Sequence, residues 1–454
     1  MLFRSVGRTP KSTSLPVGNY EISVYRQGYV EWRKKVEIKE EKSTPVYPWL
    51  VRDSISREDI YTLQDKEYIN SWYNASKTHL YFLTRYIVET EQIYRYELYR
   101  FDINTAFWDL SPNPKVVLTY DTTSETQFTL LPSPNGLTSL LNITDPTSSR
   151  YYLLDSTTSS TLDILDELDL STISSFNITW SLDSKYLLFE SDTELISLDT
   201  KTLNRYLLLQ KEEGKQYIWN TDIHGYFYSL SENISEENIY SYSLIQQLMD
   251  GTSTKTLIEK MYFQRDLEYI EIYRKGTDTK LYLPFTNSIQ STKSVGKVTN
   301  IEVNQDSKGI YIQTETSSYW YNIESKKYYL ISPYPSQLIQ FSLDHYKLIF
   351  KDTQGYSVFT FDKEDGDHTT EIGAKTIEGL QGDVQSINWI SNSLYIWYVK
   401  DNGMYIADKE GENVVKVLDG IDTLKFYIIT VSREKIYTFY TLDSGIYIDT
   451  YFLK

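Results

Sequence analysis

The feature that most constrains the fold is a β-rich unit that recurs along most of the chain. The clearest copies span residues 176–189 and 339–350. Each reads as a strand, an aromatic residue, a Ser-x-Asp turn and a second strand. After the first copy, residues 194–198 and 206–209 continue as a third and a fourth strand. Short apolar runs bounded by polar turns are typical of antiparallel strands. The unit therefore predicts a four-stranded meander.

Weaker copies of the unit follow the same order. They begin near residues 68, 128, 217, 298, 387 and 424. Meanders that repeat every ~40–60 residues are typical of β-propeller blades, because one blade buries its faces only against its neighbours. We therefore expect an all-β chain with a multi-bladed β-propeller of eight blades, or of seven as the alternative. The wide gap between residues 219 and 303 has room for an extra blade or an insertion.

The composition supports this fold class and excludes others. Tyrosine accounts for 42 of the 454 residues, whereas alanine occurs only four times. A chain so poor in the best helix former and so rich in aromatic residues is not mainly helical. The hydrophobic content of 40% excludes a disordered chain, and no apolar run reaches the ~18 residues of a membrane span. The net charge of −17 argues against a nucleic-acid partner and against docking on anionic lipid.

Two segments carry apolar residues at helical spacing. We expect a short amphipathic helix within residues 241–261, around Leu244 and Met249, and another within residues 162–170. Elsewhere the pattern of the repeat region favours strands.

The first clear unit carries a motif that resembles a known repeat. Residues 180–189 read Trp-Ser-Leu-Asp-Ser-Lys-Tyr-Leu-Leu-Phe. This resembles the W-S-P-D-G-K repeat of TolB-type propellers. The glycine of that motif is replaced by Ser184 in this copy and by His345 in the other clear copy, and its proline is replaced by leucine. Residues 133–136 keep Ser-Pro-Asn-Gly. The resemblance implies a TolB-like or WD-like propeller.

The N-terminal segment has a different pattern, with two strands and clear turn signals. Ile22 and Val24 alternate with polar residues, and residues 32–38 form a second alternating run. The motifs Gly-x-Thr-Pro, Leu-Pro-x-Gly-x-Tyr-x-Ile-x-Val and Gly-Tyr-x-x-Trp follow one another in this segment. Together they resemble the second half of a PEGA domain, over residues 7–50. The resemblance implies a small, non-catalytic β-sandwich module of bacterial and archaeal envelope proteins.

The chain is expected to divide into a truncated PEGA domain, a linker and the propeller, at residues 1–44, 45–66 and 67–454. Residues 1–5 start abruptly, so we expect them to be artefactual and the natural N-terminus to lie upstream. The last propeller unit offers only three strands. A ring with one blade incomplete would leave an open edge, so we expect part of residues 46–66 to supply the outer strand. Pro45 and Pro48 suit such an edge position.

Residues that usually carry chemistry are scarce. The chain has no cysteine, which excludes disulfides, thiolate nucleophiles and cysteine-bound metals. It has no H-E-x-x-H, G-x-S-x-G, P-loop or G-x-G-x-x-G motif. Residues 362–367 lack the alternate spacing and the distal glutamate of a calcium loop. The four histidines fall at turn-like sites in different repeats: His79, His224, His345 and His368. We therefore predict no enzyme activity, no cofactor, and no catalytic or metal-binding residue.

Two kinds of residue could form a binding surface. Tyrosine clusters at residues 151–152 and 319–321 could contact sugar or peptide. The innermost strands would line the propeller channel with six residues: Asn70, Ser71, Asn177, Thr179, Glu302 and Asn388. This set lacks the pair of carboxylates that a glycosidase needs. The sequence therefore leaves the binding residues unassigned.

Two functions stay open. The first is a non-catalytic binding or scaffold protein of the cell envelope or cell surface, which displays the propeller on a PEGA spacer to a protein or cell-wall glycan partner. This function implies a place outside the cytoplasm and a membrane anchor only through an N-terminal helix upstream of this chain. The second is a carbohydrate-active or other hydrolase with its site in the propeller channel. The scarcity of acids on the innermost strands favours the first.

Overall fold

The computed structural model describes most of the chain. The described residues are 12–41, 43–75, 78–103, 113–146, 148–164, 176–234, 240–263, 269–273, 280–284, 297–361, 372–380, 384–390, 393–421, 426–431, 434–442 and 445–453. Within them the regular elements are 36 strands. In the same residues, no helix has the length and apolar character of a membrane span.

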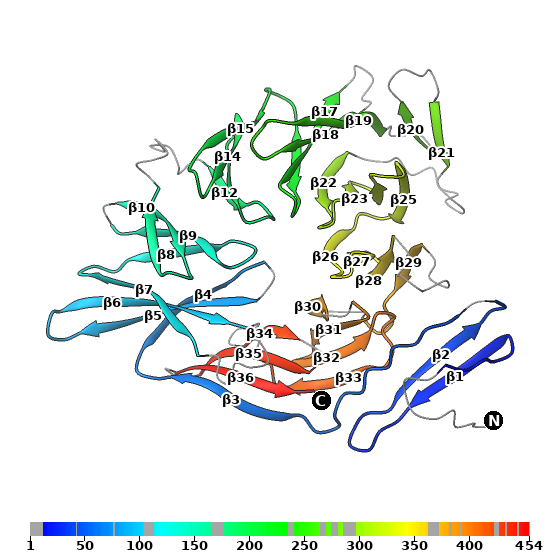
Figure 1. The fold of residues 1–454 in the computed structure, drawn as a ribbon, viewed down its shortest axis with the longest axis horizontal. Coiled ribbons are helices and arrows are strands. Elements are labelled where there is room, and N and C mark those ends of the chain that lie inside the picture. The colour runs from blue at the N-terminus through cyan, green and yellow to red at the C-terminus, as the bar shows by residue number, and fades with distance from the viewer. Residues whose placement is uncertain are drawn as a thin grey trace.

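Apart from the hairpin β1–β2, the strands form eight sheets arranged in a ring (Figure 1). Neighbouring strands are antiparallel and mostly consecutive in the chain. This is an eight-bladed β-propeller, and it confirms the predicted fold class and the larger of the two blade counts.

Six of the blades follow the predicted four-strand order. Blade 1 contains β4 (Glu67–Tyr73), β5 (His79–Val88), β6 (Ile93–Asp102) and β7 (Lys115–Thr122). Blade 2 contains β8 (Gln127–Pro132), β9 (Thr138–Thr144), β10 (Ser149–Asp155) and β11 (Ser160–Asp163). Blade 3 contains β12 (Asn177–Trp180), β13 (Tyr186–Glu190), β14 (Glu194–Asp199) and β15 (Arg205–Gln210). Blade 5 contains β22 (Val298–Val303), β23 (Gly309–Thr314), β24 (Ser318–Asn322) and β25 (Lys327–Ser332). Blade 6 contains β26 (Gln337–Phe341), β27 (Lys347–Asp352), β28 (Gly355–Thr360) and β29 (Gly373–Thr376). Blade 7 contains β30 (Val384–Trp389), β31 (Tyr395–Lys400), β32 (Gly403–Asp408) and β33 (Val415–Asp419).

Blade 4 explains the wide gap in the repeat, because it is a six-stranded sheet. Its strands are β16 (Tyr217–Thr221), β17 (Tyr226–Ile234), β18 (Tyr240–Leu248), β19 (Thr254–Phe263), β20 (Tyr269–Tyr273) and β21 (Lys280–Pro284). The predicted helix within residues 241–261 is therefore wrong. Tyr242 and Leu244 are both buried and alternate along β18, and pairing with β17 and β19 overrides the helical spacing.

The second predicted helix is also wrong in its described part. Leu162 and Asp163 belong to the short strand β11, which pairs with β10. Residues 165–170 lie outside the described residues.

Blade 8 closes the ring with strands from both ends of the chain. It contains β34 (Phe426–Val431), β35 (Lys435–Leu442) and β36 (Gly445–Phe452), and its outer strand is β3 (Ser56–Leu63). The β3–β36 register runs from Ser56 opposite Phe452 to Leu63 opposite Ile446, with a bulge between Asp59 and Tyr61. The expected outer strand is thus present, and β36 is not left as an open edge.

The cores lie between neighbouring blades and are rich in aromatic side chains. Between blades 5 and 6, Trp320 is fully buried and stacks on Phe361 at a ring-centroid distance of 4.0 Å. Gly309 leaves room for this indole, because a Cβ atom there would lie 2.0 Å from the Trp320 ring. Such close packing on both faces explains why each blade needs its neighbours.

The turn after the innermost strand has one recurrent geometry. In blade 3, the Ser181 hydroxyl donates to Asp183 Oδ1 at 2.6 Å, and Ser184 adopts a φ of 63°. In blade 6, His345 adopts a φ of 64° at the equivalent position. These are the positions at which the resembling motif carries glycine, and the left-handed backbone explains that preference.

These turns also link the blades to one another. Among the described residues, six successive junctions carry a turn-to-turn hydrogen bond: Asn74 Nδ2–Pro134 O, Asn135 N–Ser184 Oγ, Leu182 N–Thr221 Oγ1, Ser307 Oγ–Asp222 Oδ2, Asn304 Nδ2–His345 O and Asp344 N–Ser393 Oγ. The polar Ser-x-Asp residues therefore connect the blades at one end of the ring as well as shaping their own turns.

The N-terminal hairpin, β1 (Gly18–Val24) and β2 (Trp32–Ile38), is a separate two-stranded sheet beside the rim of the ring (Figure 1). Trp32 and Val36 on β2 are buried, whereas the intervening Arg33 and Lys35 are exposed. This alternation shows that one face of the hairpin packs against the propeller.

Candidate functional site

The residues predicted to line the channel lie on the innermost strands of alternate blades. Asn70 and Ser71 are on β4, Asn177 and Thr179 on β12, Glu302 on β22, and Asn388 on β30. The fold therefore spreads this set around the ring instead of gathering it in one cluster.

Glu302 is the most perturbed of these side chains. Burial raises the pKa of its carboxyl to about 7, although a hydrogen bond from Asn300 Nδ2 at 3.2 Å opposes the shift. The other carboxylate on the innermost strands is Glu67, which pairs with Arg85 at 2.8 Å. The innermost strands thus supply one carboxyl group with a raised pKa, Glu302, and their second carboxylate, Glu67, is held in an ion pair.

The structure describes three of the four histidines: His79, His224 and His345. His79 Nδ1 lies 3.0 Å from Thr78 Oγ1, and its Nε2 lies 3.5 Å from Asp102. Burial, and then the charge of Arg100, lower the pKa of His79, so the ring is neutral near pH 7. The ring also packs on Gly136 of blade 2, where a Cβ would lie 2.3 Å from Nδ1. His224 and His345 lie in turns.

Two other predicted positions lie outside the described residues: His368 and the acidic segment 362–367. In the part of the chain that is described, no three His, Asp or Glu side chains are placed to hold a metal ion.

The tyrosine clusters do not form an open surface. Tyr319, Trp320 and Tyr321 are at most 3% exposed, so this cluster belongs to the core and does not form the binding surface that the sequence left open. Both faces of a propeller blade are buried, and successive side chains of β24 therefore enter the cores on either side. Tyr151 and Tyr152 are half-buried and pack against the cores of blade 2.

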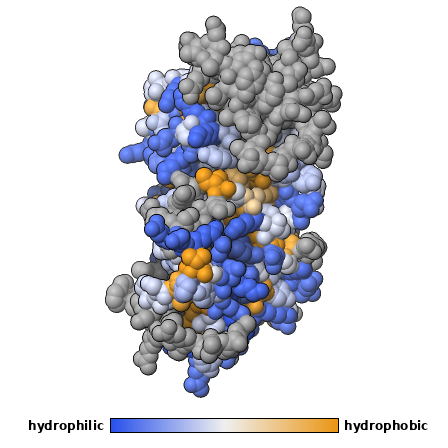
Figure 2. Space-filling model, turned by 90° about the vertical axis from the view of Figure 1, so that its right-hand side faces the viewer, coloured by the Kyte–Doolittle hydropathy of each residue, from blue (hydrophilic) through white to orange (hydrophobic). Residues whose placement is uncertain are grey.

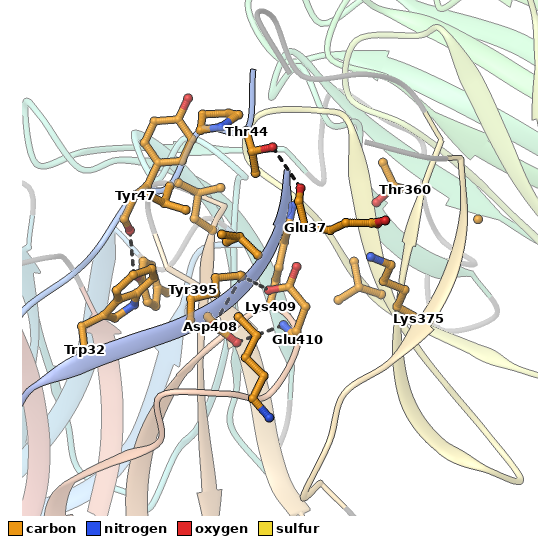
Figure 3. Close-up of a pocket in the computed structure, with 18 of the residues that line it drawn as sticks. Trp32, Glu37, Thr44, Tyr47, Thr360, Lys375, Tyr395, Asp408, Lys409 and Glu410 are labelled. Carbon is orange, nitrogen blue, oxygen red and sulfur yellow. Dashed lines mark hydrogen bonds and ion pairs between the residues drawn. The ribbon is translucent and has the colours of Figure 1, made fainter. Parts of the chain in front are cut away.

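The structure contains a pocket that the sequence did not reveal. It has a volume of about 550 Å³ and lies between β2, the linker after it, and the rims of blades 6 and 7 (Figure 3). Trp32, Tyr47 and Tyr395 form part of its wall. Its charged lining consists of five lysines and three acids: Lys34, Lys35, Lys39, Lys375, Lys409, Glu37, Asp408 and Glu410. The lining residues thus carry a net positive charge in a chain of net charge −17.

An ion-pair network joins the hairpin to blade 7 at this pocket. Lys34 Nζ lies 2.9 Å from Glu410 Oε2 and 3.7 Å from Asp408 Oδ2. Burial alone would lower the pKa of Lys34, but the two carboxylates outweigh it and raise that pKa. Burial would raise the pKa of Glu410, and the charge of Lys34 outweighs it and lowers that pKa. Both groups are therefore charged near pH 7.

The turn between β32 and β33 is shaped to receive the hairpin. Asp408 is buried, and its carboxylate accepts hydrogen bonds from the Glu412 backbone N–H at 2.7 Å and from Asn413 Nδ2 at 3.1 Å. Asn413 adopts a φ of 53°, and its Oδ1 accepts the Arg33 backbone N–H at 2.8 Å. The Asp408 carboxylate thus orders the turn that binds β2.

The linker continues this attachment toward blade 8. Val30 N donates to Val51 O at 2.9 Å, and Arg52 N donates to Leu453 O at 3.0 Å. Trp49 is buried edge-on against Tyr395, whose hydroxyl donates to Tyr47 O at 2.7 Å. The hairpin, the linker and the last blades therefore form one continuous packed unit.

Comparison with known protein families identifies the N-terminal segment. Residues 4–52 match the model of the PEGA domain family, which confirms the resemblance of the N-terminal segment. A search of curated proteins finds no match to this sequence.

Solved structures resemble the chain at low sequence identity. A structure titled as a eukaryotic initiation factor is 11% identical, with a TM-score of 0.43, and the match covers 89% of this chain and 95% of that one. Dipeptidyl peptidase 4 of Porphyromonas gingivalis is 10% identical, with a TM-score of 0.42 and coverage of 84% and 59%. The β-propeller domain of the trilobed protease from Pyrococcus furiosus is 12% identical, with a TM-score of 0.29 and coverage of 70% and 99%.

Proposed function

We propose that this protein is a non-catalytic binding scaffold of a bacterial cell envelope, in which a TolB-like propeller is the platform and the PEGA segment fixes its position. The observation that carries the proposal is the attachment of the PEGA segment to the ring. β2, within the PEGA segment, docks on blade 7, and β3, which follows the linker, completes blade 8. A spacer fixed in this way presents the propeller in a defined orientation.

Two further observations support a binding role. The lysine-rich pocket lies at the junction of the two parts, where a ligand would contact both. The described innermost strands offer neutral amide and hydroxyl groups with a single shifted carboxyl. Neutral hydrogen-bonding groups suit recognition of a protein or glycan partner better than they suit hydrolysis.

A hydrolase with its site in the channel is the second candidate, and Glu302 is the observation that favours it. A carboxyl with a pKa of about 7 is protonated often enough near neutral pH to act as a general acid. Such an enzyme would still need a nucleophile or base opposite Glu302.

An activity assay separates the two candidates. Purified protein is incubated with chromogenic peptide, ester and glycoside substrates at pH 5 to 8, beside the Glu302→Gln variant. The scaffold function predicts no turnover above the buffer blank for either protein. Turnover by the unaltered protein that disappears in Glu302→Gln would overturn the proposal in favour of the hydrolase.

The envelope location needs its own test. The complete gene is expressed with a C-terminal epitope tag, and intact cells are treated with an external protease. We expect the tag to be digested while a cytoplasmic control protein stays intact. Digestion of the tag only after cell lysis would contradict the proposed location.

A further inference from the structure

We propose that the pocket at the hairpin–propeller junction binds an extended acidic peptide, which adds to the outer edge of blade 6 as a fifth strand. The inference rests on the proposed binding role and names the class of partner. Three features lead to it: β29 is the edge strand of blade 6 among the described residues, the backbone groups of Lys35 face outward from β2, and charged side chains lie between these two strands.

Among the described residues, β29 is the edge strand of blade 6 beside the pocket. It is the last strand of blade 6, and Gly373, Ala374 and Lys375 line the pocket. Ile377 N donates to Tyr356 O at 2.9 Å, so the N–H groups of alternate residues 373, 375 and 377 face β28. The N–H and C=O groups of Ala374 and Thr376 therefore point away from the blade, toward an incoming strand.

β2 presents a second edge on the opposite side of the pocket. Arg33 N donates to Asn413 Oδ1, so the backbone groups of Arg33 face away from β1. By the same alternation the N–H and C=O groups of Lys35 also face outward. A peptide lying between β2 and β29 would pair with the backbone of β29 and contact the side chains of β2.

The charge of the pocket selects an acidic partner. Lys35 and Lys375 both line the pocket and are exposed, and the charge of Lys375 also acts on Glu410. Lysine at an exposed sheet edge often prevents unwanted strand pairing. Here two such lysines face one cavity from two different sheets, and a peptide with carboxylates at alternate positions would reach both.

The surroundings of the pocket suit a polar ligand. The face of the molecule on the hairpin side is largely hydrophilic where it is described, with small separate apolar patches (Figure 2). Within the pocket, Tyr47 and Ile372 present exposed apolar surface beside the charged groups. An alternating acidic and apolar peptide matches this arrangement, because one of its faces would contact the apolar wall and the other the lysines.

The test measures binding of a short fluorescein-labelled peptide of alternating glutamate and valine by fluorescence anisotropy. Two peptides serve as controls: one with lysine in place of glutamate, and one with N-methyl groups on alternate residues, which keeps the charge and removes the backbone donors. We expect saturable binding of the first peptide only. Equal affinity for the N-methylated peptide, or no binding of the first peptide, would overturn the proposal.

Protein variants locate the site. Lys35→Glu combined with Lys375→Glu is expected to weaken binding about tenfold or more. Lys201→Glu, an exposed lysine in a turn of blade 3, is expected to change nothing. Ala374→Pro is expected to abolish binding without lowering the melting temperature, because its N–H faces away from β28. Unchanged binding by the Lys35/Lys375 double variant would contradict this site.

The peptide assay also separates this inference from the proposed function. If the peptide binds and is cleaved, the non-catalytic role fails and the site stands. If it neither binds nor is cleaved, the site fails and the non-catalytic role stands.

Discussion

The N-terminal segment is attached to the propeller twice, and the two attachments differ in kind. β3 joins blade 8 through a backbone ladder with β36, and Ile60, Tyr61 and Leu63 pack on the core between blades 8 and 1. The β1–β2 hairpin joins blade 7 through Trp32, the Lys34 ion pairs and the hydrogen bond that Arg33 N donates to Asn413 Oδ1. The first attachment is part of the ring, whereas the second is a docked element. We therefore expect the loss of β3 to weaken the whole propeller and the loss of the hairpin to remain local.

The largest expected effect comes from deleting the closing strand. Removal of residues 1–66 eliminates β3 and leaves β36 as an open edge. The deletion removes three partly buried apolar side chains of β3 and the buried Trp49 and Val51 of the linker, which together correspond to about 5–8 kcal/mol of unfolding free energy. Removal of residues 1–40 keeps β3 and is expected to leave the melting temperature of the propeller nearly unchanged. Equal melting temperatures of the two truncated proteins would refute this difference.

A smaller and more local effect is expected at the hairpin. Trp32→Ala removes a side chain that is 3% exposed, and it should weaken docking by about 3 kcal/mol. Limited proteolysis should then cut the hairpin faster while the melting temperature of the ring stays the same. Tyr25→Ala is the matched control, because Tyr25 is 71% exposed in the hairpin loop. A parallel fall in ring stability in Trp32→Ala would show that the hairpin is not a separate element.

The stability of blade 8, where β3 pairs with β36, should depend on pH through Asp449. Its side chain is buried on β36, and burial raises its pKa to about 6 although Arg57 of β3 lies 2.9 Å away and opposes the shift. Because the pKa of Asp449 is higher in the folded state than its unfolded value of 3.8, protonated Asp449 favours the folded protein. This stabilisation is complete below pH 3.8 and is lost as the pH rises through about 6.

The Asp449→Asn variant tests this contribution. At pH 8 it should be more stable than the unaltered protein by about 2 kcal/mol, and near pH 4 the difference should vanish. Glu58→Gln, at the neighbouring exposed position of β3 opposite Thr450, is the matched control and should keep the pH profile of the unaltered protein. The measurement is urea unfolding across this pH range. A stability difference that is constant with pH would contradict the role of Asp449.

The smallest effect is expected at the ion pairs of the hairpin. Lys34→Met leaves Glu410 and Asp408 without their partner and should weaken docking by about 1–2 kcal/mol. Arg33→Met is the control, because the Arg33 side chain is exposed and pairs with Glu31 of its own hairpin. Proteolysis rates should rise for the first variant only. Equal rates would mean that the network does not hold the hairpin.

The two attachments also differ in how far the sequence predicts them. The blades can be predicted from the local alternation of apolar and polar residues and from the turn residues. The closing strand β3 can be predicted because the last unit offers only three strands, which directs attention to the segment after the hairpin. The docking of the hairpin depends on Asn413 and Glu410, which are nearly four hundred residues away from β2 and read locally as part of a polar turn. The junction pocket follows from that docking, and no sequence motif marks it.

The errors of the sequence analysis have related causes. Apolar residues such as Leu244 fit both a helix and a strand, and only the pairing of β18 with its neighbours decides between them. Tyr319 and Tyr321 suggest a surface because tyrosine has a polar end, yet both lie in an inter-blade core. In each case the deciding partner belongs to another strand or another blade.

Hydrogen–deuterium exchange of the intact protein and of Trp32→Ala tests the two kinds of attachment most directly. In the intact protein we predict that amides of β3 exchange as slowly as those of β36, and that amides of β2 are protected to a lesser degree. In Trp32→Ala, the protection of β2 should disappear while that of β3 is unchanged. Loss of protection in β3 and β2 together, or fast exchange of β2 in the intact protein, would contradict the account.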